Sequence, residues 1–201
     1  MKHVILTAFL ISLTTSVFAQ EAPEKKGFIT ISIGPAFPIG DFASTSTADP
    51  TSGFADTGVH INLINFGYLF SENVGITALL SGSAHPFAVQ TVNDPLWSYG
   101  NLMVGPLLSF PSKKRDMNFD LRVMFGTMSA TLDPDDGTSD IDGDGFAFSL
   151  GGGVRYHLSR TLSLSGNLDL ISSEPEFDVN GTEQTQQIGA LSLSVGISFR
   201  L

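Results

Sequence analysis

The segment Leu191–Leu201, LSLSVGISFRL, decides the fold, because two kinds of side chain alternate strictly along it. The apolar set comprises Leu191, Leu193, Val195, Ile197, Phe199 and Leu201. The second set comprises Ser192, Ser194, Gly196, Ser198 and Arg200. Successive side chains of a strand point to opposite faces, so the segment predicts a β-strand with one apolar face and one face of mostly small, polar residues. A transmembrane β-strand needs about 9–11 residues, and this segment supplies them.

Seven further segments show the same period of two and predict strands. They are Phe28–Ile39, Gly58–Phe70, Val74–Ala84, Trp97–Phe110, Met117–Leu132, Phe146–Leu158 and Thr161–Ile171. A meander of eight strands can close on itself, which leaves no unpaired backbone edge in lipid. We therefore predict an all-β fold, an eight-stranded antiparallel up-and-down transmembrane β-barrel, in which the last strand pairs with the first.

Two strands contain irregularities. In the second segment the apolar pattern changes phase after Leu63 and resumes at Phe66, which predicts a bulge near Ile64–Asn65. Pro106 lies within the fourth segment and cannot donate a ladder hydrogen bond, so we expect a local irregularity there.

The N-terminus has the features of a secretory signal. Lys2 and His3 precede an apolar run over residues 4–13, and Val17-Phe18-Ala19 fits a cleavage site. The run is too short for the ~20 residues of a membrane-spanning helix. We expect residues 1–19 to be a cleaved signal peptide and residues 20–201 to form one barrel domain.

The connections between the segments alternate in length and differ in charge. Short ones fall at residues 71–73, 111–116 and 159–160, and long ones at about 40–57, 85–96, 133–145 and 172–185. Short periplasmic turns and long extracellular loops are typical of outer-membrane barrels. The long connections contain many Asp and Glu residues but no Lys or Arg. We therefore expect a strongly acidic rim on the outer side.

Composition excludes several classes of function. The chain has no cysteine, which removes disulfides, thiolate metal sites and cysteine nucleophiles. Charged residues make up only 15% of the sequence, and the formal net charge is −10. Such a balance disfavours binding to the phosphate backbone of a nucleic acid.

Four stretches resemble a known family. They are Gly34–Phe42 (GPAFPIGDF), Gly67–Asn73 (GYLFSEN), Gly153–Ser159 (GVRYHLS) and the terminal Gly196–Leu201 (GISFRL). Together they resemble the small eight-stranded outer-membrane β-barrels, the OmpA/OmpX-like group. The resemblance implies the outer membrane of a Gram-negative cell, contact with its lipid and lipopolysaccharide, and recognition of the last strand by the barrel-insertion machinery. It implies no particular activity, because members of one fold do different work.

The most conspicuous acidic motif is Asp140-Ile-Asp142-Gly-Asp144-Gly145. Alternate carboxylates followed by glycine match the first half of a calcium loop, although the twelfth position holds Gly151 instead of the bidentate Glu. An EF-hand is thereby excluded. A looser Ca²⁺ site at Asp140, Asp142 and Asp144 remains a candidate, and a solvated acidic loop is the favoured alternative; we expect no other cofactor.

His157 and Ser159 resemble the His/Ser pair of outer-membrane lipid A deacylases, in which His activates Ser. Here the pair lies at a predicted periplasmic turn, away from the outer leaflet, and no acid follows closely to orient the histidine. We therefore expect no enzymatic activity.

Several polar residues share the inward face of the predicted strands: His60, Asn62, Asp120, Arg122, Arg155, Asn167 and Asp169. An eight-stranded barrel is just wide enough for side chains to fill it, and buried charges have to be paired. We expect a polar plug that holds the barrel together, with a proton or ion path as the alternative. The resemblance also assigns Tyr68, Phe70, Trp97, Tyr99 and Phe110 to an interfacial aromatic girdle, with ordinary packing as the alternative.

Three functions remain open at this point. We favour a monomeric, non-enzymatic barrel with a structural or surface-interaction role through its acidic loops. A narrow, porin-like channel for small solutes is the alternative, and a lipid-modifying enzyme is the third. A soluble lipocalin-like barrel is the rival fold, because periodicity alone does not show which face lies inside.

Overall fold

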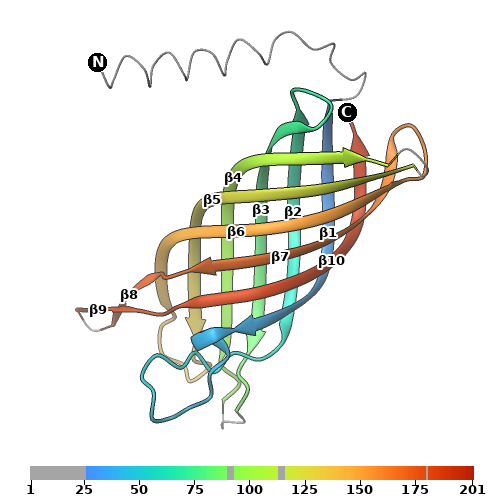
Figure 1. The fold of residues 1–201 in the computed structure, drawn as a ribbon. Helices are drawn as coiled ribbons and strands as arrows, with labels where there is room; N and C mark the ends of the chain where they lie inside the picture. Colours follow the sequence, from blue (N-terminus) through green and yellow to red (C-terminus); the bar gives the residue numbers. More distant parts are fainter. Residues whose placement is uncertain (1–25, 90–92, 113–115, 180) are drawn as a thin grey trace, which may run out of the picture.

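A closed antiparallel barrel occupies most of the described chain, which in this computed structural model comprises residues 26–89, 93–112, 116–179 and 181–201 (Figure 1). The predicted signal peptide lies outside the described residues. Among those that are described, no helix is long and apolar enough to cross a membrane.

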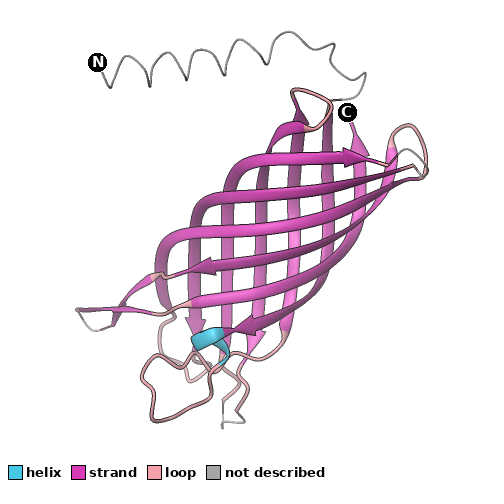
Figure 2. Cartoon of the chain, viewed as in Figure 1, coloured by secondary structure: helices cyan, strands magenta, loops and turns pink. Residues whose placement is uncertain are grey.

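Eight long strands build the barrel wall (Figure 2). They are β1 (Gly27–Ile39), β2 (Gly58–Leu69), β3 (Val74–Pro86), β4 (Leu96–Pro111), β5 (Met117–Asp133), β6 (Ile141–His157), β7 (Leu162–Ser173) and β10 (Ile188–Arg200). Each pairs antiparallel with the next in this order. β10 pairs with β1, from Phe28–Arg200 to Ile39–Gly189, and this ladder closes the barrel. The predicted fold class and closing pair are confirmed.

The structure also decides which face is inside. On β10 the residues Ser192, Ser194 and Ser198 are buried in the lumen, whereas Leu193 and Val195 are exposed on the outer wall. The same arrangement recurs around the barrel, with large apolar side chains such as Phe146 (68% exposed) facing outward. A lipocalin would bury these residues, so the rival fold is excluded and the apolar band is available to lipid.

Both predicted irregularities are present. Between β2 and β3 the register shifts between Asn62 and Ile64, and Leu63 and Ile64 both face outward, as a bulge requires. At Pro106 the ladder to β5 is interrupted between the pairs Val104–Phe125 and Leu107–Arg122, but the register is unchanged on both sides. Pro106 remains in register with Ile76 on its other side. The proline therefore removes pairing locally without producing a bulge.

Two features of the loop end differ from the prediction: the start of one strand and an additional hairpin. β6 begins at Ile141 instead of Phe146, because its ladder with β5 continues beyond the apolar band as far as Leu132–Ile141. The last long connection contains a hairpin, β8 (Glu176–Val179) and β9 (Thr182–Thr185), which extends the sheet through a short pairing of β8 with β6. The added part of β6 is polar and lacks the apolar alternation used to recognise strands, whereas β8 and β9 are only four residues each, too short for their pattern to stand out.

The two ends of the barrel differ, as Figure 1 shows. The three short turns and the C-terminus lie at one end, here called the turn end. The long connections lie at the other, the loop end, together with the β8–β9 hairpin and a 3₁₀ helix, η2 (Gly40–Ala43). The predicted alternation of short and long connections is thereby confirmed.

Candidate functional site in the barrel lumen

Two buried ion pairs cross the turn-end half of the lumen. Arg122 on β5 donates hydrogen bonds to both carboxylate oxygens of Asp169 on β7, at 2.7 and 2.7 Å from Nη2 and 3.0 Å from Nε. Arg155 on β6 binds Asp120 on β5, with Nε 2.6 Å from Oδ2. Its guanidinium also lies 3.7 Å from the ring centroid of Phe28, so cation–π contact adds to the pairing.

Gly151 makes the Arg122–Asp169 pair possible. β6 lies between β5 and β7, and Gly151 is in register with Arg122 on one side and Asp169 on the other. A Cβ atom at this position would lie 2.0 Å from Asp169 Oδ1 and 2.8 Å from Arg122 Nε. The absence of a side chain therefore lets two residues on strands that are not neighbours meet across the intervening one.

An uncharged network fills the space beside the ion pairs. His60 hydrogen-bonds with Ser83 at 2.7 Å and with Asn62 at 3.0 Å. Asn62 donates to Ser32 at 2.9 Å, and Ser32 in turn bonds to Ser194 at 3.0 Å. The network links β3, β2, β1 and β10, and Asn167 on β7 reaches the same serines at 3.5 Å. All seven predicted lumenal residues are buried and hydrogen-bonded, so the inward placement predicted from the sequence is confirmed.

Apolar side chains close the loop-end half of the lumen, which the sequence did not predict. Phe42 in η2 is 0% exposed and folds into the mouth. Its ring makes edge contacts with His85, Trp97 and Tyr99, at centroid distances of 5.3, 5.8 and 6.3 Å. Below it, inward methionines extend the cluster: Met103, Met124 and Met128. Two features of the sequence could have indicated this cluster. Large apolar residues occur on both faces of β4 and β5, and Phe42 closely follows Gly40. The φ of Gly40 is +64°, which allows the chain to turn toward the lumen.

The aromatic girdle prediction is partly wrong. Phe70 and Phe110 are exposed on the outer wall, and Tyr68 packs edge-on against Phe70. Trp97 and Tyr99, however, are only 5% and 4% exposed and belong to the loop-end cluster. Both occupy inward positions of β4, in phase with Asn101 and Met103. The distance of a residue from the end of its strand does not decide which face its side chain takes. The alternation of side chains along β4 places the rings of Trp97 and Tyr99 in the lumen.

The three candidate calcium ligands do not lie in one loop. Asp140 precedes β6, whereas Asp142 and Asp144 lie on the strand itself and are exposed on its outer face. Asp142 accepts a hydrogen bond of 2.7 Å from the Thr131 hydroxyl. Within the described part of the chain, no three acidic, His or Cys side chains are gathered closely enough to hold a metal ion. The structure provides no preformed site, and calcium binding stays a prediction.

The structure does not bring His157 and Ser159 together as a catalytic pair. The His157 ring hydrogen-bonds with Ser163 through Nδ1 and with Asn118 through Nε2, both at 2.8 Å. Ser159 Oγ accepts hydrogen bonds from the backbone N–H groups of Thr161 and Leu162, which fixes the β6–β7 turn. Each side chain therefore has a structural partner, and both lie at the turn end.

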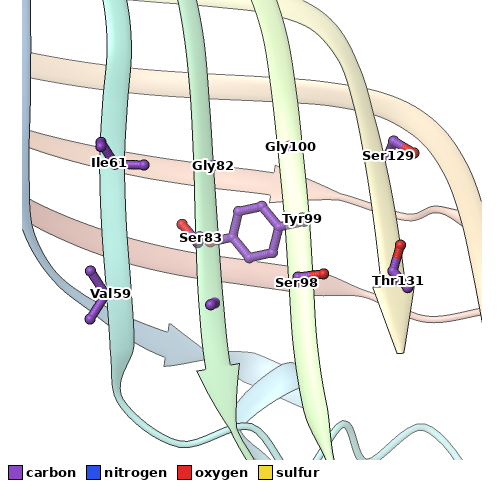
Figure 3. A pocket seen from close by; sticks show the side chains of 10 residues that line it. Val59, Ile61, Gly82, Ser83, Ser98, Tyr99, Gly100, Ser129 and Thr131 are labelled. Carbon is purple, nitrogen blue, oxygen red and sulfur yellow. The ribbon is translucent and has the colours of Figure 1, made fainter. Parts of the chain in front are cut away.

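A shallow depression of about 550 Å³ lies on the wall itself, across β2 to β5 near the loop end (Figure 3). Small residues at outward positions produce it, among them Gly82, Gly100 and Ser129, which are in cross-strand register. The hollow is open over much of its area and follows from the absence of large side chains. We assign no ligand to it.

Comparisons with known proteins agree with this architecture. The model of a family described as "outer membrane protein beta-barrel domain" matches residues 5–200. No curated protein matches the sequence. Among solved structures, Neisserial surface protein A (NspA) is 12% identical, with 87% of this chain and 97% of that one covered and a TM-score of 0.57. OprG of Pseudomonas aeruginosa is also 12% identical, with 90% and 97% covered and a TM-score of 0.53.

At such low identity these two structures show the likeness of fold alone. The family match spans nearly the whole sequence and agrees with the closed barrel and its outward apolar band. The chain therefore belongs to the outer membrane protein beta-barrel domain family and is a protein of the cell outer membrane.

Proposed function

We propose that the protein is a non-enzymatic outer-membrane barrel that displays an acidic loop end for contact with surfaces and that keeps its lumen closed. The double closure of the lumen carries this proposal. Ion pairs block the turn-end half, and the Phe42 cluster blocks the loop-end half. A path wide enough for solutes would have to displace both closures.

The charge of the loop end supports a role in surface contact. The long connections contain carboxylates and no Lys or Arg. Two of these carboxylates are fixed by local hydrogen bonds that keep them ionised. The Thr51 backbone N–H and hydroxyl hold the pKa of Asp49 below its usual value, and the Thr138 hydroxyl and N–H do the same for Asp136. Such a rim attracts basic surfaces and repels anionic ones, most strongly at low salt.

Binding of the barrel in nanodiscs to polylysine-coated and heparin-coated beads tests the surface role. We expect retention on polylysine that weakens as salt rises, and none on heparin. Asp135→Asn with Asp136→Asn should reduce retention. The matched substitutions Glu72→Gln with Asp116→Asn, at the turn end, should not. Equal retention on both polymers, or equal losses in both variants, would contradict the proposal.

Contact with anionic lipopolysaccharide would need a bridging cation at the same rim, and Asp140, Asp142 and Asp144 are the candidate ligands. Calorimetric titration with Ca²⁺ tests this, since a heat that disappears in Asp142→Asn with Asp144→Asn would support a site. An absence of heat at low millimolar Ca²⁺ would exclude one. We also expect a monomer, because the closed ladder leaves no barrel strand with a free edge.

A narrow channel is the second candidate, and one observation favours it. Several inward side chains have no hydrogen-bond partner within the described residues, including both amide atoms of Asn101 and the hydroxyls of Ser81 and Ser149. Buried polar atoms are usually satisfied by protein or water, so these positions suit water molecules. Planar-bilayer recordings separate the two candidates. We expect no stable steps; ion-selective steps that change in Arg122→Ala would support the channel instead.

A further inference from the structure

A second cavity lies at the loop end, beside the cluster that closes the lumen. It has a volume of about 350 Å³ and is formed by segments far apart in the sequence, including Pro50, residues 52–54, Phe87, Phe177 and residues 184–186. Trp97 also lines it. The volume is at the low end of the roughly 300–1,000 Å³ of known ligand pockets, so only a compact molecule would fit. We call this cavity the mouth pocket.

Four aromatic rings form a fixed wall of the mouth pocket. The Trp97 indole N–H donates to the Gly53 carbonyl at 2.8 Å, and its ring packs edge-on against Phe177 at 5.8 Å. Phe54 and Phe87 stack with their planes 10° apart and centroids 6.2 Å apart. Hydrogen bonds and ring contacts thus hold the wall in place, so a ligand would meet a preformed surface.

The backbone at Phe54 is strained in a way that serves this wall. Its φ is +54°, which is rare for a residue with a large side chain. Two backbone hydrogen bonds keep it there, from Phe54 N–H to Ser44 O at 2.9 Å and from Ala88 N–H to Phe54 O at 2.7 Å. Strain of this kind persists where the surroundings over-determine it, often at ligand clamps. Here it positions the Phe54 ring against Phe87.

The pocket wall is uncharged, but the loop end to which it belongs is rich in carboxylates. None of the described residues that line it is acidic or basic. Acidic residues adjoin the lining segments directly in sequence: Asp49 before Pro50, Asp133 after Leu132, Asp140 and Asp142 around Ile141, Glu176 and Asp178 around Phe177, and Glu183 before Gln184. These carboxylates are exposed. A cavity with an aromatic wall inside a negative field favours a cation with an apolar body and disfavours an anion.

We propose that the mouth pocket binds small organic cations, namely a substituted ammonium group carried on a compact aromatic or branched alkyl body. The cationic group lies against the aromatic rings within the negative field of the acidic loop end, and the apolar body replaces water against Trp97 and the Phe54–Phe87 stack. The site goes beyond the proposed function, because a small molecule would bind there whether or not the loops contact a surface.

Trp97 makes the test direct, since it is the only tryptophan of the chain. The barrel in nanodiscs of zwitterionic lipid is titrated with benzyltrimethylammonium while Trp97 emission is followed. Empty nanodiscs correct for uptake of the probe by lipid. Benzyl alcohol and phenylacetate serve as the neutral and anionic aromatic comparisons. We expect a saturable change with the cation, and half-saturation at least tenfold higher with phenylacetate.

Two substitutions locate the binding. Phe87→Ala removes one ring of the stack and should raise half-saturation at least fivefold. Phe70→Ala, the same change on the outer wall of the turn end, should leave it unchanged. Phe87→Leu keeps the apolar bulk without the ring and replaces Phe87→Ala if that variant does not fold. The proposal is wrong if no saturable change occurs, if phenylacetate binds as well as the cation, or if neither Phe87 variant weakens binding.

Discussion

The two halves of the lumen are closed by different chemistry and by different parts of the chain. In the turn-end half, barrel strands supply both members of every pair, as in Arg122–Asp169 and Arg155–Asp120. In the loop-end half a residue from outside the wall, Phe42, completes an apolar cluster. The polar half is therefore part of the wall itself, whereas the apolar half is a plug held by a loop. Damage to the first should weaken the whole barrel, and damage to the second should first loosen the mouth.

The largest effect is expected from Arg122→Ala. It leaves the Asp169 carboxylate, 0% exposed, without its cation. Breaking a buried pair by removing one partner costs about 3–5 kcal/mol. We expect the free energy of unfolding to fall by this amount in urea titrations of the detergent-folded barrel, followed by heat-modifiable electrophoretic mobility. The exposed Glu72→Ala, at the turn end, is the control and should change it by less than about 0.5 kcal/mol. Similar losses in the two variants would mean that the pair does not support the wall.

A somewhat smaller effect is expected from Phe42→Ala. Removing a buried phenylalanine costs about 3–5 kcal/mol, and we expect a value near the lower end, because Phe42 lies on a loop that can relax into the space left. Because Phe42 packs against Trp97, we also expect Trp97 emission to shift to the red and acrylamide to quench it more strongly. Phe110→Ala on the outer wall should leave Trp97 emission unchanged. Unaltered emission in Phe42→Ala would show that the loop does not plug the mouth in solution.

Gly151→Ala tests the geometry of the polar half with one added methyl group. The new Cβ would collide with Asp169 Oδ1, so we expect a cost of about 1–3 kcal/mol, the usual range for an overpacked core. The adjacent Gly152→Ala is a close control, because its nearest contact would be an ordinary 3.6 Å to Leu121. Comparing the loss of unfolding free energy in the two variants, in the same urea titrations, tests whether Gly151 makes room for the Arg122–Asp169 pair. Equal losses would point to strand propensity instead of the ion pair.

The smallest effect is expected at the loop carboxylates. Hydrogen bonds from Thr138 hold the pKa of Asp136 below its usual value, so folding favours the ionised form. Its stabilising contribution is complete above the unfolded pKa and is lost as pH falls through the lower folded value. We therefore expect Asp136→Asn to lower the urea midpoint slightly at pH 7 and not at pH 2.5. A larger loss at the acidic pH would reverse the sign and contradict the assignment.

Much of the wall was predictable because strand geometry is local. Alternation along Leu191–Leu201 and along the seven other segments predicted the strands, and the phase change after Leu63 predicted the bulge. The same parity placed His60, Arg122 and Asp169 inside, since inward and outward positions alternate wherever the register is unbroken. Polar extensions such as Ile141–Gly145 were missed, because beyond the apolar band no alternation marks a strand.

The sequence by itself determined the strands, their two faces, the acidic loops and the small polar residues that share one of those faces, because each depends on residues close together in the chain. Tertiary structure alone decided that the polar face is the inner one, because the direction of closure distinguishes the two faces. It also decided that Arg122 meets Asp169 across Gly151, and that Phe42, Trp97 and Phe177 gather at the mouth. Those contacts join residues from separate loops and strands, and only the closed barrel brings their side chains within reach of one another.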